Sequence, residues 1–355
     1  MNRLADRADG AQPAGHAADP PDGAAPNPGR STPVGRVLTS LIRVMGSKVV
    51  RIGFLVAVMA LLTVALVAQG ETLWHEVQRL SVPIVLAALA LNLCGLLCSL
   101  MVWREMLADL GSRLSIAEAW RIMFIGQLAK YIPGSIWPVL AQSELGADRG
   151  IPRRSSALSV LLCYAVMTAS GAAVAAIALP FARARTTDQY FWILILVPVS
   201  ILLLSPPVLN RLLAFVLRLA RQPALERGVS YVGLARSIAW AIASWAFNGL
   251  TVYVLLRQLA GHPQGTLLVS VGAYSLSWTA GFLAVFAPAG AGVREAVMVA
   301  VLSTRTTTAI ALTIALVTRA TAVLCDAITG AVAAALVGRR RLRQLRSARQ
   351  DAPLS

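Results

Sequence analysis

Five charged residues stand in stretches of the sequence that are otherwise apolar. They are Lys130, Arg294, Glu295, Arg319 and Asp326. A charged side chain inside a membrane-spanning segment is costly, so it is usually paired or lines a functional cavity. Lysine and arginine bind phosphate oxygens, and a neighbouring carboxylate can hold an arginine in place. We therefore expect a binding site for an anionic head group, with a set of purely structural ion pairs as the alternative.

Arg319 and Asp326 are seven residues apart, which is two helical turns and places them on one face. They can pair with each other through a neighbour or line a cavity, and Asp326 is also a candidate proton site. Lys130 reaches a phosphate in one interpretation and extends to the membrane interface in the other.

Two segments interrupt the apolar sequence with helix-breaking residues. "GQLAKYIPGSIWPV", from Gly126 to Val139, contains Pro133 and Gly134. Lipid cannot hydrogen-bond the backbone groups that a break exposes, so a break at membrane depth implies a cavity lined by protein or water. A helix beginning after the second break would also present free N–H groups to an anion. We expect the two breaks to face each other. The second segment, "GFLAVFAPAGAGVREAV", carries Pro288, Gly290 and Gly292 and would start a helix near Gly292.

Three further polar residues, Gln127, Glu144 and Asn248, are secondary candidates. Lone polar residues in membrane helices more often hydrogen-bond a neighbouring helix than a ligand. Glu144 follows the first break, and its simpler interpretation is a polar residue of the returning arm.

The composition is that of an all-α polytopic membrane protein. Of 355 residues, 57% are hydrophobic and 14% charged, and the mean hydropathy is +0.68. A soluble domain is about 45–50% apolar and about 25% charged. The formal net charge of +16 is typical of basic loops beside anionic lipid, and no nucleic-acid-binding motif accompanies it. The four cysteines lie in apolar runs without a neighbouring histidine, so we expect no metal site, and no cofactor or ATP-binding motif is present.

The apolar runs and basic loops predict about six full transmembrane helices and two re-entrant, broken hairpins. The positive-inside rule places both termini in the cytoplasm. The segments Ser115–Gly146 and Pro263–Ser303 must then each enter and leave on one side; a plain eight-helix topology is the alternative. The expected spans are Ile52–Gly70, Ser81–Trp103, Ser155–Ala182, Gln189–Asn210, Ser237–Leu256 and Thr306–Val337.

Three regions follow from this pattern: a disordered cytoplasmic tail over 1–47, a transmembrane domain over 48–338, and a basic cytoplasmic tail over 339–355. A basic amphipathic helix after Asn210, with Arg211, Arg218 and Arg221 near one face, is expected at the inner membrane surface.

The two break segments align with each other at a constant offset of 155 residues. Gly126 matches Gly281, and Pro133 matches Pro288. The alignment predicts an internal repeat with halves at about 81–182 and 237–337. By the expected topology the halves are inverted, which is a recurring transporter design.

The same segments resemble a known family. "APAGAGVREAVMVAVLS", followed by Arg319, is similar to the Pro-Gly-Gly-x-Gly-x-x-Glu segment of the transmembrane, flippase-like domain of lysylphosphatidylglycerol synthases. "YIPGSIWPVLAQSELGADRGIP" resembles its Leu-Pro-Gly segment, but has Trp137-Pro138 where many members have Gly-Asp and then an arginine. No aminoacyl-transferase domain accompanies the resemblance, which therefore implies a stand-alone member that handles lipid without aminoacyl transfer.

These observations favour a flippase-like transporter, not an enzyme, in the cell membrane of a bacterium. Its expected substrate is an anionic lipid or a polyprenyl-phosphate-linked glycan used in cell-envelope assembly, with membrane lipids and envelope glycosyltransferases as partners. The alternative is a non-transporting accessory or regulatory subunit of an envelope lipid- or glycan-modifying enzyme. It would dock through its two tails.

Overall fold

The computed structural model describes residues 70–131, 137–181, 194–219, 221–225, 227–261, 266–284 and 287–350. The predicted N-terminal tail, nearly all of the span Ile52–Gly70, and the first break at Pro133 and Gly134 lie outside the described residues.

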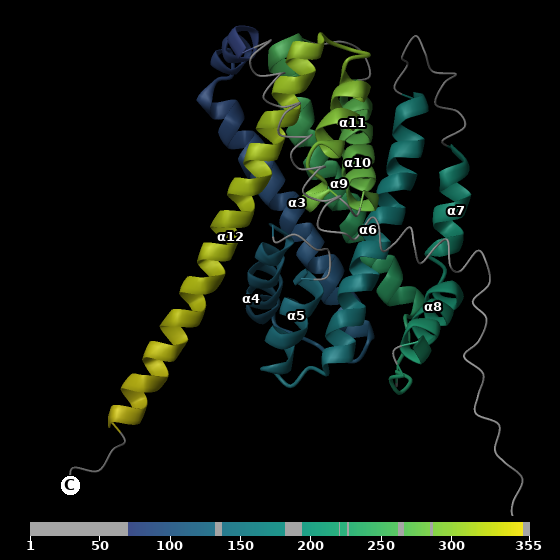
Figure 1. Ribbon diagram of the computed structural model, residues 1–355, viewed down its shortest axis with the longest axis vertical. Helices are drawn as coiled ribbons and strands as arrows, with labels where there is room; N and C mark the ends of the chain where they lie inside the picture. The colour runs from purple at the N-terminus through teal and green to yellow at the C-terminus, as the bar shows by residue number, and fades with distance from the viewer. Residues whose placement is uncertain are drawn as a thin grey trace, which may run out of the picture. The chain divides into compact units, whose positions relative to one another are not determined.

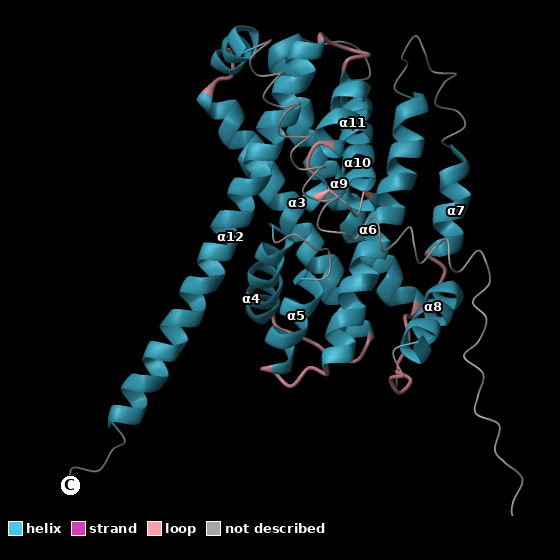
Figure 2. Cartoon of the chain, in the orientation of Figure 1, coloured by secondary structure: helices cyan, strands magenta, loops and turns pink. Residues whose placement is uncertain are grey.

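The described part of the chain is helical and contains no strand (Figure 2). Five of its helices are long and apolar enough to cross a membrane. This confirms the predicted fold class. The five are α3 (Val82–Asp109), α6 (Arg153–Phe181), α9 (Tyr231–Ala260), α10 (Thr266–Leu283) and α12 (Thr308–Gln350). In α12 the apolar span ends at Leu336, and the helix continues through the basic C-terminal segment to Gln350.

The predicted span Gln189–Asn210 is not one straight helix. Its described part contains α7 (Leu196–Leu203) and the start of α8 (Pro206–Leu219), and the chain bends by 62° between them. Pro206 and Pro207 cause the break, because proline lacks the N–H that would continue the α7 hydrogen bonds. The amphipathic helix thus begins before Arg211. It buries Leu209, Leu213 and Leu217 and exposes Arg211 and Arg218.

The first broken segment forms two short helices joined near a 3₁₀ turn. They are α4 (Ile116–Gln127), which runs into η1 (Leu128–Tyr131), and α5 (Trp137–Ala147). With 12 and 11 residues, each is about 18 Å long or less, too short for a hydrocarbon core of about 30 Å.

Both ends of this pair meet on one side of the bundle. Ser115 Oγ accepts a hydrogen bond from the Glu118 N–H and donates one to Glu118 Oε2, which caps α4. Arg149, which follows α5, donates to Glu118 Oε1 at 2.9 Å. The hydrogen bond from Ser115, and then the charge of Arg149, lower the pKa of Glu118. These contacts agree with the predicted re-entrant hairpin.

The second broken segment has unequal arms. Its first arm, α10, has 18 residues and is long enough to be counted as a span, and its second arm, α11 (Val293–Leu302), has 10. The two helices pack against each other after the 3₁₀ turn η3 (Pro288–Gly290). In Figure 1 the α4–α5 pair lies below the α10–α11 pair along the long axis of the view.

The order of elements repeats. A long helix, a short-helix pair and a second long helix occur as α3, α4–α5, α6 and again as α9, α10–α11, α12. The second half begins at Tyr231, six residues before the predicted start at Ser237. Packing between the halves is reciprocal, because α6 contacts α10 while α12 contacts α4, and η1 contacts η3.

Hydrogen bonds between α3 and α9 establish that the repeat is inverted. Asn92 Nδ2 donates to Asn248 Oδ1 at 3.2 Å, between residues 156 positions apart. On either side, Ser244 Oγ donates to the Gly95 carbonyl and Thr251 Oγ1 to the Ala88 carbonyl. The α9 partner number falls as the α3 number rises, so the helices are antiparallel. The same 156-residue offset relates Ala88 to Ser244 and Gly95 to Thr251, so it converts each outer bond into the other. A pseudo-twofold axis therefore passes through the asparagine pair.

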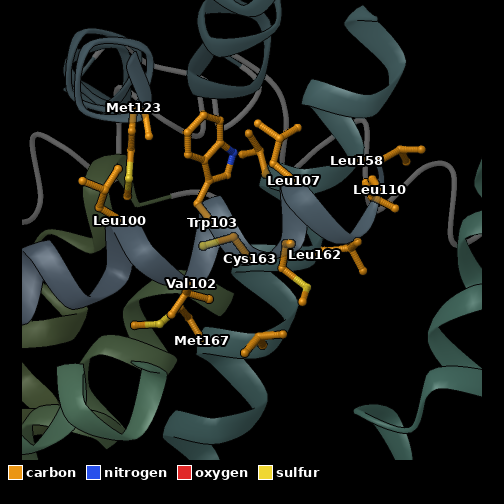
Figure 3. Close-up of a cluster of buried hydrophobic side chains, with 14 of the residues drawn as sticks. Leu100, Val102, Trp103, Leu107, Leu110, Met123, Leu158, Leu162, Cys163 and Met167 are labelled. Carbon is orange, nitrogen blue, oxygen red and sulfur yellow. The ribbon is translucent and has the colours of Figure 1, made fainter. Parts of the chain in front are cut away.

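A buried core holds the first hairpin against α3 and α6. Trp103 of α3 is 1% exposed and packs with Leu107, Met123 of α4 and Cys163 of α6 (Figure 3). A second cluster joins α9, α10, α11 and α12. Each hairpin is therefore fixed by its own apolar core, and the flanking turns η1 and η3 contact each other.

Candidate functional site: a charged cavity between the two breaks

A cavity of about 320 Å³ lies between the two hairpins, where η1 contacts η3. Its wall includes residues of α3, α6, α9 and α12, together with the ends of both hairpins. This volume is at the lower end of the range of about 300–1,000 Å³ typical of small-molecule sites. A small recess of about 30 Å³ adjoins it and shares Arg294 and Arg319 with it.

The structure brings the five predicted charged residues together. Lys130, Arg294, Arg319 and Asp326 line the cavity, and Glu295 lines the adjoining recess. The cavity therefore gathers charge from η1, α11 and α12, which are far apart in the sequence.

Arg319 and Asp326 each pair with a different hairpin. Lys130 Nζ of η1 lies 2.7 Å from Asp326 Oδ2, and Arg319 Nε lies 3.7 Å from Glu295 Oε1 of α11. The two residues on α12 thus line the cavity instead of pairing with each other. Through them, α12 is tied to both breaks at once.

Arg294 has a different environment from the other cations. Its guanidinium carbon lies 5.3 Å from the centre of the Trp278 ring, a cation–π contact. Its Nε is buried and has no hydrogen-bond partner in the described part of the chain. A buried donor without a partner is costly, so Arg294 is the cation of the site whose hydrogen-bonding capacity the described residues do not meet.

Glycines make this placement of Arg294 possible. A Cβ at Gly281 would overlap Arg294 Cγ, and one at Gly290 would lie 2.7 Å from Arg294 Nε. Gly290 and Gly292 also have φ of +71° and +81°, which glycine adopts without strain. As predicted, the helix after the break begins beside Gly292, at Val293, and Glu295 Oε2 accepts the Gly292 N–H at 2.6 Å. Pro288 begins η3.

The first hairpin also packs a polar side chain against a glycine, but an uncharged one. A Cβ at Gly126 would overlap the Gln142 side chain, just as Gly281 meets Arg294. Gln142 is buried, and its Oε1 also has no partner among the described residues. Both hairpins therefore pack a polar side chain against a glycine, but the 155-residue offset does not relate Gln142 to Arg294.

An aromatic cluster in the cavity wall was not predicted. Trp278 stacks on Phe282 at 5.4 Å and meets Trp245 edge-on at 5.3 Å. Tyr274, Trp278 and Phe282 are spaced four residues apart on α10, directly before the break. That spacing puts three rings on one helical face and could have indicated the wall of a site.

Of the three secondary candidates, two line the cavity and one does not. Gln127 and Asn248 line the cavity, and Asn248 also bonds Asn92 across the helix interface. Glu144 is not brought to the cavity: it is exposed and forms a paired hydrogen bond with Arg153 at 2.8 and 2.9 Å. This agrees with its simpler interpretation as a polar residue of the returning arm.

In the described residues no group of three or more His, Cys, Asp or Glu side chains is placed to hold a metal ion. The four cysteines, predicted as packing residues, are free thiols, and three of them are buried.

Taken together, the fold and the cavity define a polytopic membrane protein built as an inverted repeat, with broken helices around a charged site. Comparison with family models matches residues 50–330 to the lysylphosphatidylglycerol synthase TM region. The chain belongs to this family, whose domain is membrane-embedded and flippase-like. Comparison with curated proteins gives no significant match.

Proposed function

We propose that the protein is a flippase-like transporter that moves the anionic head group of a lipid, or of a polyprenyl-phosphate-linked glycan, across a bacterial cytoplasmic membrane. The observation that carries the proposal is Arg294, which lines the cavity between the two hairpins and whose buried Nε has no hydrogen-bond partner among the described residues. A phosphate oxygen is a suitable acceptor for such a guanidinium.

The cavity wall supports a lipid as the ligand. Leu283 lines the cavity, and 63% of its surface is exposed. An apolar chain could therefore stay in the bilayer beside Leu283 while its head group occupies the charged interior. No covalent step is part of this proposal.

The two ion pairs suggest how the site could alternate between states. Lys130–Asp326 and Arg319–Glu295 tie α12 to one hairpin of each half. An incoming phosphate would compete with Asp326 for Lys130 and with Glu295 for Arg319. Exchange of these partners would loosen one hairpin at a time, as alternating access in inverted repeats requires.

The distribution of basic residues supports a cytoplasmic location for the end where α3 finishes and where α6 and α9 begin. Arg104, Arg149, Arg153 and Arg236 cluster there around Glu105, Glu118 and Glu144. Basic loops favour the cytoplasmic side. We propose on this basis that both termini lie inside, where envelope glycosyltransferases that load a lipid carrier could act as partners.

The test is transport in proteoliposomes. Fluorescent phosphatidylglycerol would be reconstituted with the parent protein, with Arg294→Gln and with Arg218→Gln, and its transbilayer movement followed by quenching from outside. We expect Arg294→Gln to slow movement by about tenfold or more, because it removes a buried charge-assisted contact. Arg218 is exposed on α8, outside the cavity, and is the matched control.

Equal, slow movement for all three proteins with each lipid tried would contradict transport. It would instead favour the accessory subunit, whose activity would require the tails and a partner enzyme.

A further inference from the structure

The cavity contains an unequal number of positive and negative charges. Three cations, Lys130, Arg294 and Arg319, accompany two carboxylates, Asp326 and Glu295, in the described cavity and its recess. The undescribed segments at the two breaks, 132–136 and 285–286, contain no acidic or basic residue. With all five groups ionised, the site carries one net positive charge.

The excess charge is localised on one residue. Both carboxylates are within 4 Å of a cation, at 2.7 Å for Asp326 and 3.7 Å for Glu295. Glu295 Oε2 also accepts the Gly292 N–H. Among the described residues Arg294 forms no ion pair within 4 Å; its guanidinium contacts the Trp278 ring, and its Nε has no hydrogen-bond partner there.

We infer that the site selects a phosphodiester head group with a single negative charge and no ammonium group; this rests on the proposed transport function. One phosphodiester charge would neutralise the excess at Arg294. An ammonium on the head group would find both carboxylates already paired, and in a low-dielectric cavity an unpaired charge is costly. A phosphomonoester or diphosphate brings further negative charge that the site does not match.

The selected chemistry has two sources in a bacterial membrane. One is phosphatidylglycerol, and the other is a sugar linked to a polyprenyl monophosphate. Both join an uncharged polyol to a phosphodiester. Aminoacylated phosphatidylglycerol, the product after which the family is named, would be excluded by its ammonium groups.

The experiment is competitive binding measured by native mass spectrometry of the purified full chain. Equimolar phosphatidylglycerol, lysyl-phosphatidylglycerol, phosphatidylethanolamine and phosphatidic acid would be offered together, and a polyprenyl-monophosphate hexose in a second mixture. We expect the parent protein to retain phosphatidylglycerol over the other three by about tenfold. The second mixture decides which of the two phosphodiester sources binds more tightly.

Charge variants test the reason for the selection. Glu295→Gln keeps an oxygen that can accept the Gly292 N–H, but raises the net charge of the site by one. Asp326→Asn makes the same change on α12. We expect both to shift retention from phosphatidylglycerol toward phosphatidic acid by about tenfold, and Arg294→Gln to abolish discrimination against phosphatidylethanolamine.

The outcomes separate the two proposals. If no phosphodiester lipid is retained in an Arg294-dependent manner, the proposed function itself fails. If lipid is retained but lysyl-phosphatidylglycerol binds as well as phosphatidylglycerol, the transporter stands and the charge selection is wrong. A folded, monodisperse Glu295→Gln protein with the parent's lipid ranking would also overturn the selection, whether or not Asp326→Asn folds.

Discussion

Lys130 Nζ lies 2.7 Å from Asp326 Oδ2, and this ion pair joins the break of the first repeat to the last helix of the second. The Asp326 side chain is 7% exposed and that of Lys130 31%. The pair therefore connects the two halves at the wall of the cavity, where water reaches one partner better than the other.

Breaking this pair on one side should destabilise the protein more than removing both charges. Lys130→Met leaves the Asp326 carboxylate buried without this cation, and we expect a loss of about 1–3 kcal/mol, less than for a fully buried pair. Lys130→Met combined with Asp326→Leu should recover at least part of the loss. Chemical denaturation of the detergent-solubilised variants measures this cycle. Additive losses in the double variant would show that the pair is not coupled.

Gly281 should accept no side chain. Gly281→Ala places a Cβ against Arg294 Cγ, so either the guanidinium shifts or α10 moves away from α11. We expect a loss of about 1–3 kcal/mol from overpacking, together with weaker binding of phosphatidylglycerol. Gly70→Ala is the control, because a Cβ there has nothing within 4 Å. Wild-type binding by a stable Gly281→Ala protein would argue against the described position of Arg294.

The inverted arrangement of α3 and α9 can be tested by cross-linking. In a background without native cysteines, Ala88→Cys with Thr251→Cys should link readily, because Thr251 Oγ1 contacts the Ala88 carbonyl at 3.4 Å. Ala88→Cys with Ser244→Cys should not, because Ser244 contacts Gly95, about two turns further along α3. Gel mobility before and after reduction reads the result. Linking of the second pair alone would mean that the two helices run parallel.

Glu118 should contribute stability that depends on pH. Its pKa is lowered in the folded protein by the hydrogen bond from Ser115 and by Arg149. A lowered folded pKa stabilises the protein above the ordinary carboxylate range, and the contribution disappears as pH falls through the lowered value. Because the site is solvent-exposed, we expect Glu118→Gln to cost about 1 kcal/mol or less at pH 7. The variant and parent should converge in strongly acidic buffer, as thermal unfolding at several pH values would measure. A difference that persists at low pH would assign the effect to the cap geometry instead of to the charge.

The sequence by itself determined the class of the protein and indicated the charged residues that line its cavity. Arg294, Arg319 and Asp326 could be selected because a charge in an apolar run is costly wherever the chain folds. The second break was indicated by Pro288, Gly290 and Gly292 for a similarly local reason. Proline restricts φ and lacks an N–H, and glycine adopts positive φ, each at its own position. The repeat was visible because its two copies share residue types at one offset.

The tertiary structure alone decided which charges meet. Lys130 and Asp326 are far apart in the sequence, and no periodicity relates them. Their contact follows from η1 packing against α12. The same holds for the Arg294 Nε, which has no partner among the described residues, and for the position of Glu144 outside the cavity, because pairing depends on the position of every neighbouring group. Local patterns report the cost of placing a residue in the membrane, whereas the partner that offsets this cost is fixed only when distant helices pack together.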